Sequence, residues 1–72
     1  MMIAKKIKEL RKAKDWSQVQ LAIEIDVYPD YISWWESGKR EPSLSNAIML
    51  ADAFGVSLDE LCGRVKGSVI ND

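Results

Sequence analysis

The close spacing of helix-start and helix-stop signals is the strongest constraint on how this chain can fold. Ser17 with Gln20, and Ser57 with Glu60, are capping boxes, in which a serine and a residue three positions later satisfy backbone donors at the start of a helix. Apolar residues recur at helical spacing between these signals. Glycines, which end helices readily, follow three of the stretches: Gly38, Gly55 and Gly63. The sequence therefore predicts an all-α fold, a compact bundle of five short helices.

The first helix is expected over residues 3–14, and the second begins at Gln18. Pro29 has a fixed φ that suits the first position of a helix, so it starts the third. A fourth helix runs from about Leu44 through Ile48 and Ala51 to Phe54, and a short fifth follows Ser57. The second and third helices should bury a common set of side chains: Leu21, Ala22, Ile25, Ile32 and Trp35.

Length and composition exclude several classes of protein. Seventy-two residues make one small domain, 1–72, which buries only about 60% of its unfolded surface. The single Cys62 and the absence of histidine remove a disulfide framework, a zinc cluster and histidine-dependent nucleophilic catalysis. We therefore expect no enzyme, no metal and no cofactor. The apolar runs are too short for a membrane span, and Lys5 and Lys6 interrupt any signal-peptide core, so we expect a cytoplasmic protein without a membrane partner.

The formal net charge of -1 hides an uneven distribution of charge. Residues 1–14 carry six cations and one carboxylate, whereas residues 15–38 carry five carboxylates and no cation. The lysines of the first helix can form a solvated face or a cationic surface for a partner, and the first reading is the simpler one. Proteins that bind nucleic acid are normally basic, so the overall charge argues mildly against DNA binding.

Residues 17–37 satisfy the physical demands of a helix-turn-helix, two short helices that cross steeply through a tight turn. The crossing requires a small residue, supplied by Ala22. The turn requires a residue that tolerates left-handed angles, and Asp26 stands there. Apolar residues on both sides of the turn can lock the pair, among them Val27. The small residue, the turn residue and the apolar residues all stand at the spacing that a helix-turn-helix requires. A helix-turn-helix is therefore the expected arrangement of helices two and three.

Further along the chain stand the strings IKELRK (7–12), WSQ (16–18), WESGK (35–39) and LADAFGVSLDEL (50–61). Together with the helix-turn-helix they resemble the Cro/CI-type family of DNA-binding domains, also described as phage-repressor-like or as the xenobiotic-response-element family. The resemblance covers about residues 3–62 and leaves 63–72 as a short C-terminal tail. It implies a lambda-repressor-like bundle whose third helix enters the major groove of double-stranded DNA.

The resemblance also implies roles for individual residues. Arg11 and Glu36 match positions that pair as ions and tie helix one to helix three. Phosphate contacts are implied for four residues at the start of helix two and after helix three: Ser17, Gln18, Lys39 and Arg40. The positions facing the groove are Tyr28, Pro29, Asp30, Tyr31, Ser33 and Trp34. Glycines frequent in the family are replaced by aspartates at positions 15 and 26.

The groove-facing positions leave two functions open. None is a cation, and none is an Asn or Gln that could make a bidentate contact with a base. The first reading is a sequence-specific transcriptional regulator, a repressor that binds a two-fold symmetric operator as a homodimer. The second is a protein-interaction or antitoxin-type module that uses Tyr31 and Trp34 for a partner. Trp34 lies about 100° from Trp35 around the helix, so it either contacts DNA or a partner or folds back over the protein.

Overall fold

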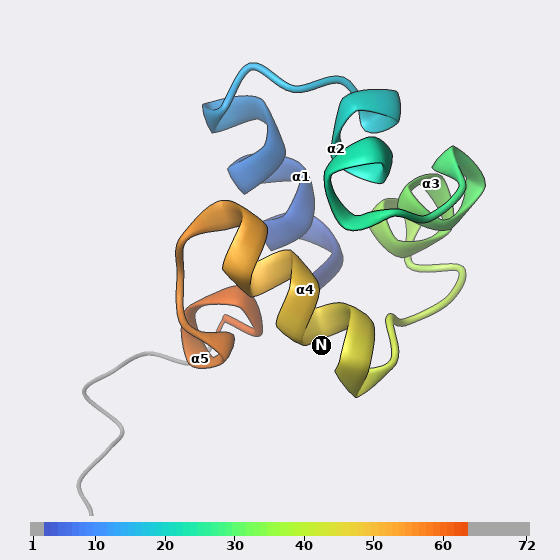
Figure 1. Cartoon of the computed structure of the whole chain (residues 1–72). Helices are drawn as coiled ribbons and strands as arrows, with labels where there is room; N and C mark the ends of the chain where they lie inside the picture. The colour runs from blue at the N-terminus through green and yellow to red at the C-terminus, as the bar shows by residue number, and fades with distance from the viewer. Residues whose placement is uncertain (1–2, 64–72) are drawn as a thin grey trace, which may run out of the picture.

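The computed structural model describes residues 3–63, and five α-helices account for most of them. The helices are α1 (Ile3–Ala13), α2 (Gln18–Ile25), α3 (Pro29–Ser37), α4 (Leu44–Phe54) and α5 (Leu58–Leu61). Figure 1 shows α2 and α3 beside one another, with α4 in front of α1 and the short α5 below it. The predicted all-α fold of five short helices is confirmed.

The helix-turn-helix forms as the sequence predicts. Asp26 ends α2 in the left-handed conformation, with φ of 60°, and its backbone N–H donates to the carbonyls of Ala22 and Ile23. Pro29 occupies the first turn of α3, and Tyr28 precedes it without a side-chain capping bond. Asp15 is the other non-glycine residue with positive φ within residues 3–63. Aspartate accepts this conformation more readily than most residues, which explains how the turns form without glycine.

Serine side chains cap three of the helices. The hydroxyl of Ser17 accepts a hydrogen bond from the backbone N–H of Gln20 at 3.0 Å, and Ser57 accepts one from Glu60 at 3.1 Å. Ser43 makes the same contact with Asn46 at the start of α4, which the sequence analysis did not identify. Each bond satisfies a backbone donor that the first turn of a helix would otherwise leave without a partner.

One hydrophobic core joins all five helices. Its fully buried side chains come from every helix: Ile7, Leu21, Ile25, Ile32, Leu50 and Leu61. In α4 the buried stripe is Ala47, Leu50, Ala51 and Phe54, at the i, i+3, i+4 and i+7 positions of one helical face. Ile48, one residue round the helix from Ala47, is 43% exposed.

Other features follow from the same packing. Trp16 is half-buried and packs on Phe54, and Cys62 is a half-buried free thiol against the core.

Within residues 3–63 no helix combines the length and apolar character needed to cross a bilayer. The tail predicted over residues 63–72 lies, after Gly63, outside the described residues.

Candidate nucleic-acid interface

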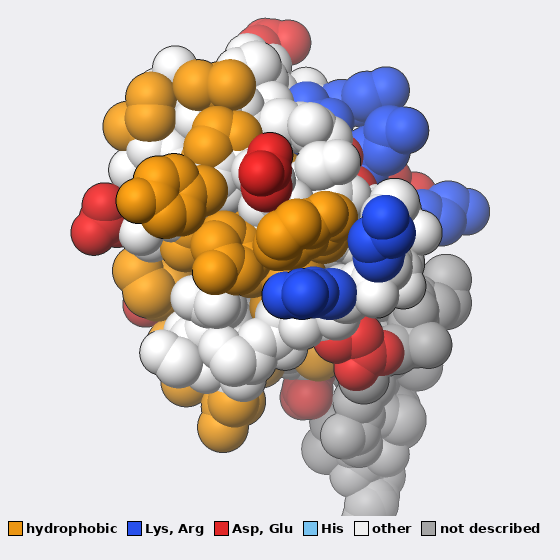
Figure 2. Space-filling view, turned by 90° about the vertical axis from the view of Figure 1, so that its right-hand side faces the viewer, with side chains coloured by type: hydrophobic (Ala, Val, Ile, Leu, Met, Phe, Trp, Pro, Cys, Tyr) orange, Lys and Arg blue, Asp and Glu red, His pale blue; other side chains and the backbone are white. Residues whose placement is uncertain are grey.

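Helix α3 presents one face to the core and the other to solvent. Ile32 and Trp35 are buried, whereas the residues expected to face the groove are exposed: Tyr28, Pro29, Asp30, Tyr31 and Ser33. Figure 2 shows hydrophobic side chains running across this side of the molecule, with a carboxylate among them and cationic side chains beside them. The structure thus gathers the expected groove-facing residues on one accessible surface, and their contacts with DNA stay a prediction.

Trp34 differs from the other groove-facing residues because it is only half-exposed. The guanidinium of Arg40 lies over its ring, 4.5 Å from the ring centroid. Tyr31 packs against the same indole in a T-shaped arrangement, with ring centroids 5.4 Å apart. Of the two alternatives for Trp34, the structure shows the indole held against its own chain.

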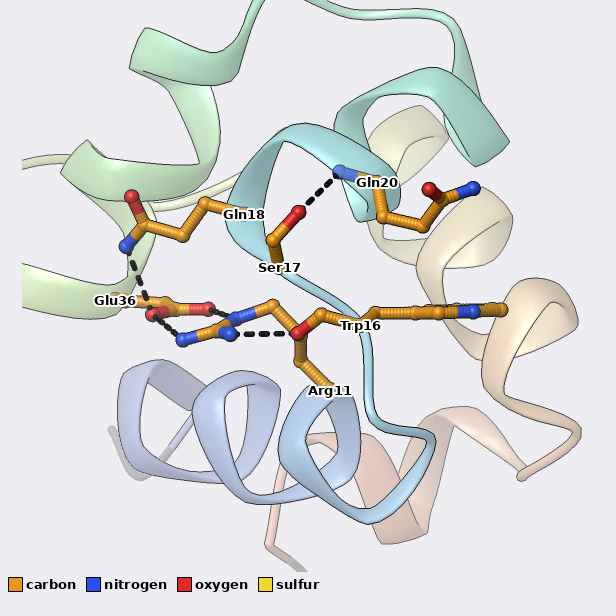
Figure 3. A network of polar contacts seen from close by, with 6 residues as sticks. All are labelled: Arg11, Trp16, Ser17, Gln18, Gln20 and Glu36. Atoms are coloured by element: carbon orange, nitrogen blue, oxygen red, sulfur yellow. Dashed lines mark hydrogen bonds and ion pairs between the residues drawn. The ribbon is translucent and has the colours of Figure 1, made fainter.

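The Glu36 carboxylate connects three helices (Figure 3). It accepts hydrogen bonds from Arg11 of α1, at 2.6 Å to Nε and 3.0 Å to Nη2. It also accepts a bond of 3.1 Å from the side-chain amide of Gln18, at the start of α2. The second terminal nitrogen of Arg11 donates to the backbone carbonyl of Trp16 at 2.8 Å. The ion pair that the resemblance implies is therefore present, and Gln18 is part of the same network.

Burial and pairing together determine the charge state of Arg11, the buried charged residue of the described chain. The hydrogen bond to Glu36 raises the pKa of the Arg11 guanidinium above its ordinary value, and the nearby negative charge acts in the same direction. Burial opposes them by disfavouring the charged form. Arg11 consequently stays charged, and its charge is directed inward to Glu36.

An open hollow at the junction of α1, α2 and α3 brings further cations to this surface. It is lined by Lys8, Arg11, Lys12, Gln18, Ser33, Glu36 and Ser37. The sequence predicts DNA contacts for Gln18 and Ser33. For Lys8 and Lys12 the simpler expectation is a solvent-exposed helix face. The spacing contains a signal that could have found them, since Lys8, Arg11 and Lys12 share one helical face at i, i+3 and i+4.

The two residues after α3 that are expected to contact phosphates, Lys39 and Arg40, have backbone N–H groups bound to the end of the helix. Gly38 ends the helix with φ of 81°, and the chain then turns back. The backbone N–H groups of Lys39 and Arg40 both donate to the carbonyl of Trp34, at 2.9 and 3.3 Å. Ser17, also expected at a phosphate, is exposed, and its hydroxyl already caps α2. The four expected phosphate residues thus lie before and after α3 in sequence, at the start of α2 and in the turn that follows α3.

Comparison with known proteins decides the family. Residues 7–61 match the family model described as Helix-turn-helix. This chain belongs to the helix-turn-helix family. Within it, the relatives are phage-repressor-like, which confirms the Cro/CI-type resemblance.

Two relatives of this helix-turn-helix chain illustrate the likeness. The cryptic phage CTXphi transcriptional repressor RstR of Vibrio cholerae serotype O1 is 39% identical over 64 residues, which are 89% of this chain and 57% of RstR. The chain thus spans little more than half the length of that relative. The control protein C.MunI of a Mycoplasma species is 44% identical over 62 residues, 85% of this chain and 84% of that protein.

The fold of this helix-turn-helix chain is also that of a solved repressor. The crystal structure of the P22 c2 repressor in complex with synthetic operator 9T superimposes with a TM-score of 0.80 at 29% identity. The match covers 94% of this chain and 98% of that one. The lambda-repressor-like bundle expected from the sequence is therefore confirmed.

Proposed function

We propose that this chain is a sequence-specific DNA-binding transcriptional regulator, a repressor that reads its operator with α3 in the major groove. The observation that carries the proposal is the exposed face of α3, on a helix-turn-helix whose expected phosphate residues precede and follow that helix. RstR is named as a transcriptional repressor, and the P22 c2 repressor was solved on an operator, which supports the same reading.

The phosphate contacts come from two groups of residues. Ser17 and Gln18 act at the start of α2, where the helix N-terminus also favours an anion. Lys39 and Arg40 act after α3. We add Lys8 and Lys12, which share the hollow with Gln18. The residues that read bases or groove shape are Tyr28, Pro29, Asp30, Tyr31 and Ser33, whereas the ring of Trp34, expected among them, is held under Arg40.

The functional unit is a homodimer on a two-fold symmetric site, because one module of this size buries too little surface for tight specific binding. The half-sites then lie about one helical turn of DNA, roughly 34 Å, apart. Residues 1–72 act as one domain with its family-like core at about 3–62, and the protein acts in the cytoplasm, without catalytic activity of its own.

A second function uses the same surface for a protein partner, as in an antitoxin-type module. The observation that favours it is the exposure of apolar side chains on α2 and before α3, where Ile23 is 65% and Tyr28 77% exposed. The contact of the half-exposed Trp34 with Arg40 weakens this second function, because one of the two aromatic residues expected to bind a protein partner already has a partner within the chain.

Selection from a random duplex library at moderate salt tests the proposal, followed by titration of the enriched duplex across a salt series. We expect enrichment of a palindrome, two chains per duplex, and an affinity that falls steeply with salt. Replacing Arg40 by Ala should weaken binding to every sequence and flatten the salt slope by about one unit. If nothing is enriched and no binding occurs even at low salt, the regulator is excluded and the protein-interaction function takes its place.

A further inference from the structure

The contacts of Trp34 raise the question of what this side chain does on a face expected to bind DNA. Its ring lies under the Arg40 guanidinium and meets Tyr31 edge-to-face. Trp34 therefore has intramolecular partners on α3 and on the chain that follows α3. A base-reading residue would need this ring free, so the geometry argues for a different role.

The backbone explains why Arg40 returns to a residue six positions before it. The left-handed Gly38 reverses the chain, and the N–H groups of residues 39 and 40 both donate to the Trp34 carbonyl. This holds the backbone of Arg40 against the carbonyl of Trp34, and the Arg40 guanidinium reaches the indole of the same residue. Lys39 shares the turn and the charge but stacks on no aromatic ring of the described chain. The two neighbouring cations thus differ in their contact with Trp34 as well as in the shape of the charged group.

We propose that Trp34 is a positioning residue that holds the Arg40 guanidinium ready for a DNA phosphate. The inference rests on the proposed function. The guanidinium carbon lies over the Trp34 ring, so the aromatic contact uses the face of the group, and its N–H donors can make a bidentate contact with phosphate oxygens. An unsupported arginine loses much rotamer freedom on binding, and Trp34 removes part of that loss beforehand. Trp34 thereby favours DNA binding through Arg40, without itself reading a base.

A double-mutant cycle on the enriched duplex tests this role. Trp34→Ala should weaken binding by about two- to five-fold, the range expected for one cation–π contact at an exposed site. In the Arg40→Ala background the same substitution should cause no further loss. Trp34→Phe, which keeps an aromatic face, should recover part of the affinity. An equal loss with and without Arg40, or no loss at all, overturns the positioning role.

Lys39→Ala supplies the matched control. Because Lys39 does not stack, its loss should multiply with that of Trp34→Ala rather than replace it. A general weakening of the fold by Trp34→Ala would instead reduce affinity in every background, Arg40→Ala included. A wild-type chain that binds no duplex overturns the proposed function, and the positioning role with it. A wild-type chain that binds DNA without coupling between Trp34 and Arg40 overturns the positioning role alone.

The stacking itself can be tested without DNA. The indole N–H resonance of Trp34 can be assigned by its loss in Trp34→Phe. We expect Arg40→Ala to shift this resonance, because it removes the guanidinium from the ring, and Lys39→Ala to leave it nearly in place. A resonance that responds to neither substitution, or equally to both, overturns the inference whatever the DNA measurements show.

Discussion

Glu36 accepts hydrogen bonds from side chains of two other helices, and its side chain is only 5% exposed. Arg11, its ionic partner, has a side chain that is 10% exposed. A pair so poorly solvated cannot replace a lost partner with water at little cost. The single carboxylate therefore matters both for stability and for the placement of Gln18.

Replacing Glu36 by Gln should lower the free energy of unfolding by about 3 kcal/mol, because it leaves the Arg11 charge buried without a counter-charge. Urea unfolding measures the effect. Glu24→Gln is the control, since Glu24 is exposed on α2 and the change in charge is the same. Equal midpoints for the two variants would contradict the role assigned to Glu36. The raised pKa of Arg11 means that its contribution is fully present at neutral pH and is lost only in the strongly alkaline range.

Asp30 is the carboxylate in the first turn of α3. A negative charge at this position stabilises the helix, because it interacts favourably with the positive end of the helix dipole. The same charge would repel the phosphates of an approaching duplex. Asp30→Ala should raise the affinity for random duplex by about two- to five-fold, as expected for one exposed charge interaction, and slightly lower stability. Asp52→Ala, which removes a carboxylate from α4, is the control and should have little effect on affinity. If Asp30→Ala instead weakens binding to sites with one particular base pair only, Asp30 reads that base directly.

At the scale of the elements, the helix ends decide where the interface residues lie. Ser17 and Ser43 cap α2 and α4 through equivalent hydrogen bonds, but only Ser17 is expected to contact DNA. Ser17→Ala and Ser43→Ala should each lower the free energy of unfolding by about 1 kcal/mol, measured by thermal or urea unfolding. Both variants should therefore be equally stable, but only Ser17→Ala should also weaken DNA binding. Equal affinities for the two variants would remove Ser17 from the phosphate contacts.

The sequence predicted these helix ends because the signals are local. Ser17, Ser57, Pro29 and the left-handed Asp26 act within a few residues of their own position, and each lies where it was expected. Ser43 caps α4 by an equally local contact, but it was not predicted. The stacking of Arg40 on Trp34 was not predicted, because it depends on how the chain turns back after Gly38. The exposure of Ile48 likewise depends on which face of α4 meets the other helices, and the apolar pattern alone did not decide it.

In the candidate site, too, some features could be predicted from the sequence and others depend on how distant segments pack. Family resemblance supplied the pairing of Arg11 with Glu36 and the groove-facing positions, and periodicity supplied the buried stripe of Ile32 and Trp35 in α3. Lys8 and Lys12 were not predicted as part of the candidate interface. Their spacing places them on one face of α1 with Arg11, but the packing of α1 beside α2 and α3 is what brings that face to the hollow that Gln18 lines.

At the scale of the whole molecule, the net charge of -1 says little about DNA binding, since cations are concentrated on particular faces. Lys8 and Lys12 line the hollow beside Gln18, whereas Lys5 and Lys6 line a separate one with Glu9 and Gly63. The two lysine pairs lie on one helix, carry equal charge and differ in their neighbours. They allow local phosphate contact to be separated from overall charge.

Replacing both Lys8 and Lys12 by Ala should weaken DNA binding and flatten the salt slope by up to about two units, because each phosphate contact contributes about 0.9. Replacing Lys5 and Lys6 by Ala changes the net charge equally and should leave the slope nearly unaltered. A salt titration of both double variants on the enriched duplex measures this. Similar slopes for the two variants would mean that only overall charge matters.

The outward face of α3 carries Asp30 and no lysine or arginine, and this affects how many molecules a cell needs. A genome offers roughly 10⁶–10⁹ competing sites, so a regulator that holds random DNA tightly is mostly sequestered away from its operator. On the proposed function, the Asp30 carboxylate on α3 reduces that sequestration, because it repels the phosphates of random DNA. On the proposed function, few copies of this protein would keep one operator occupied, and small changes in its synthesis would pass directly to the gene that it controls.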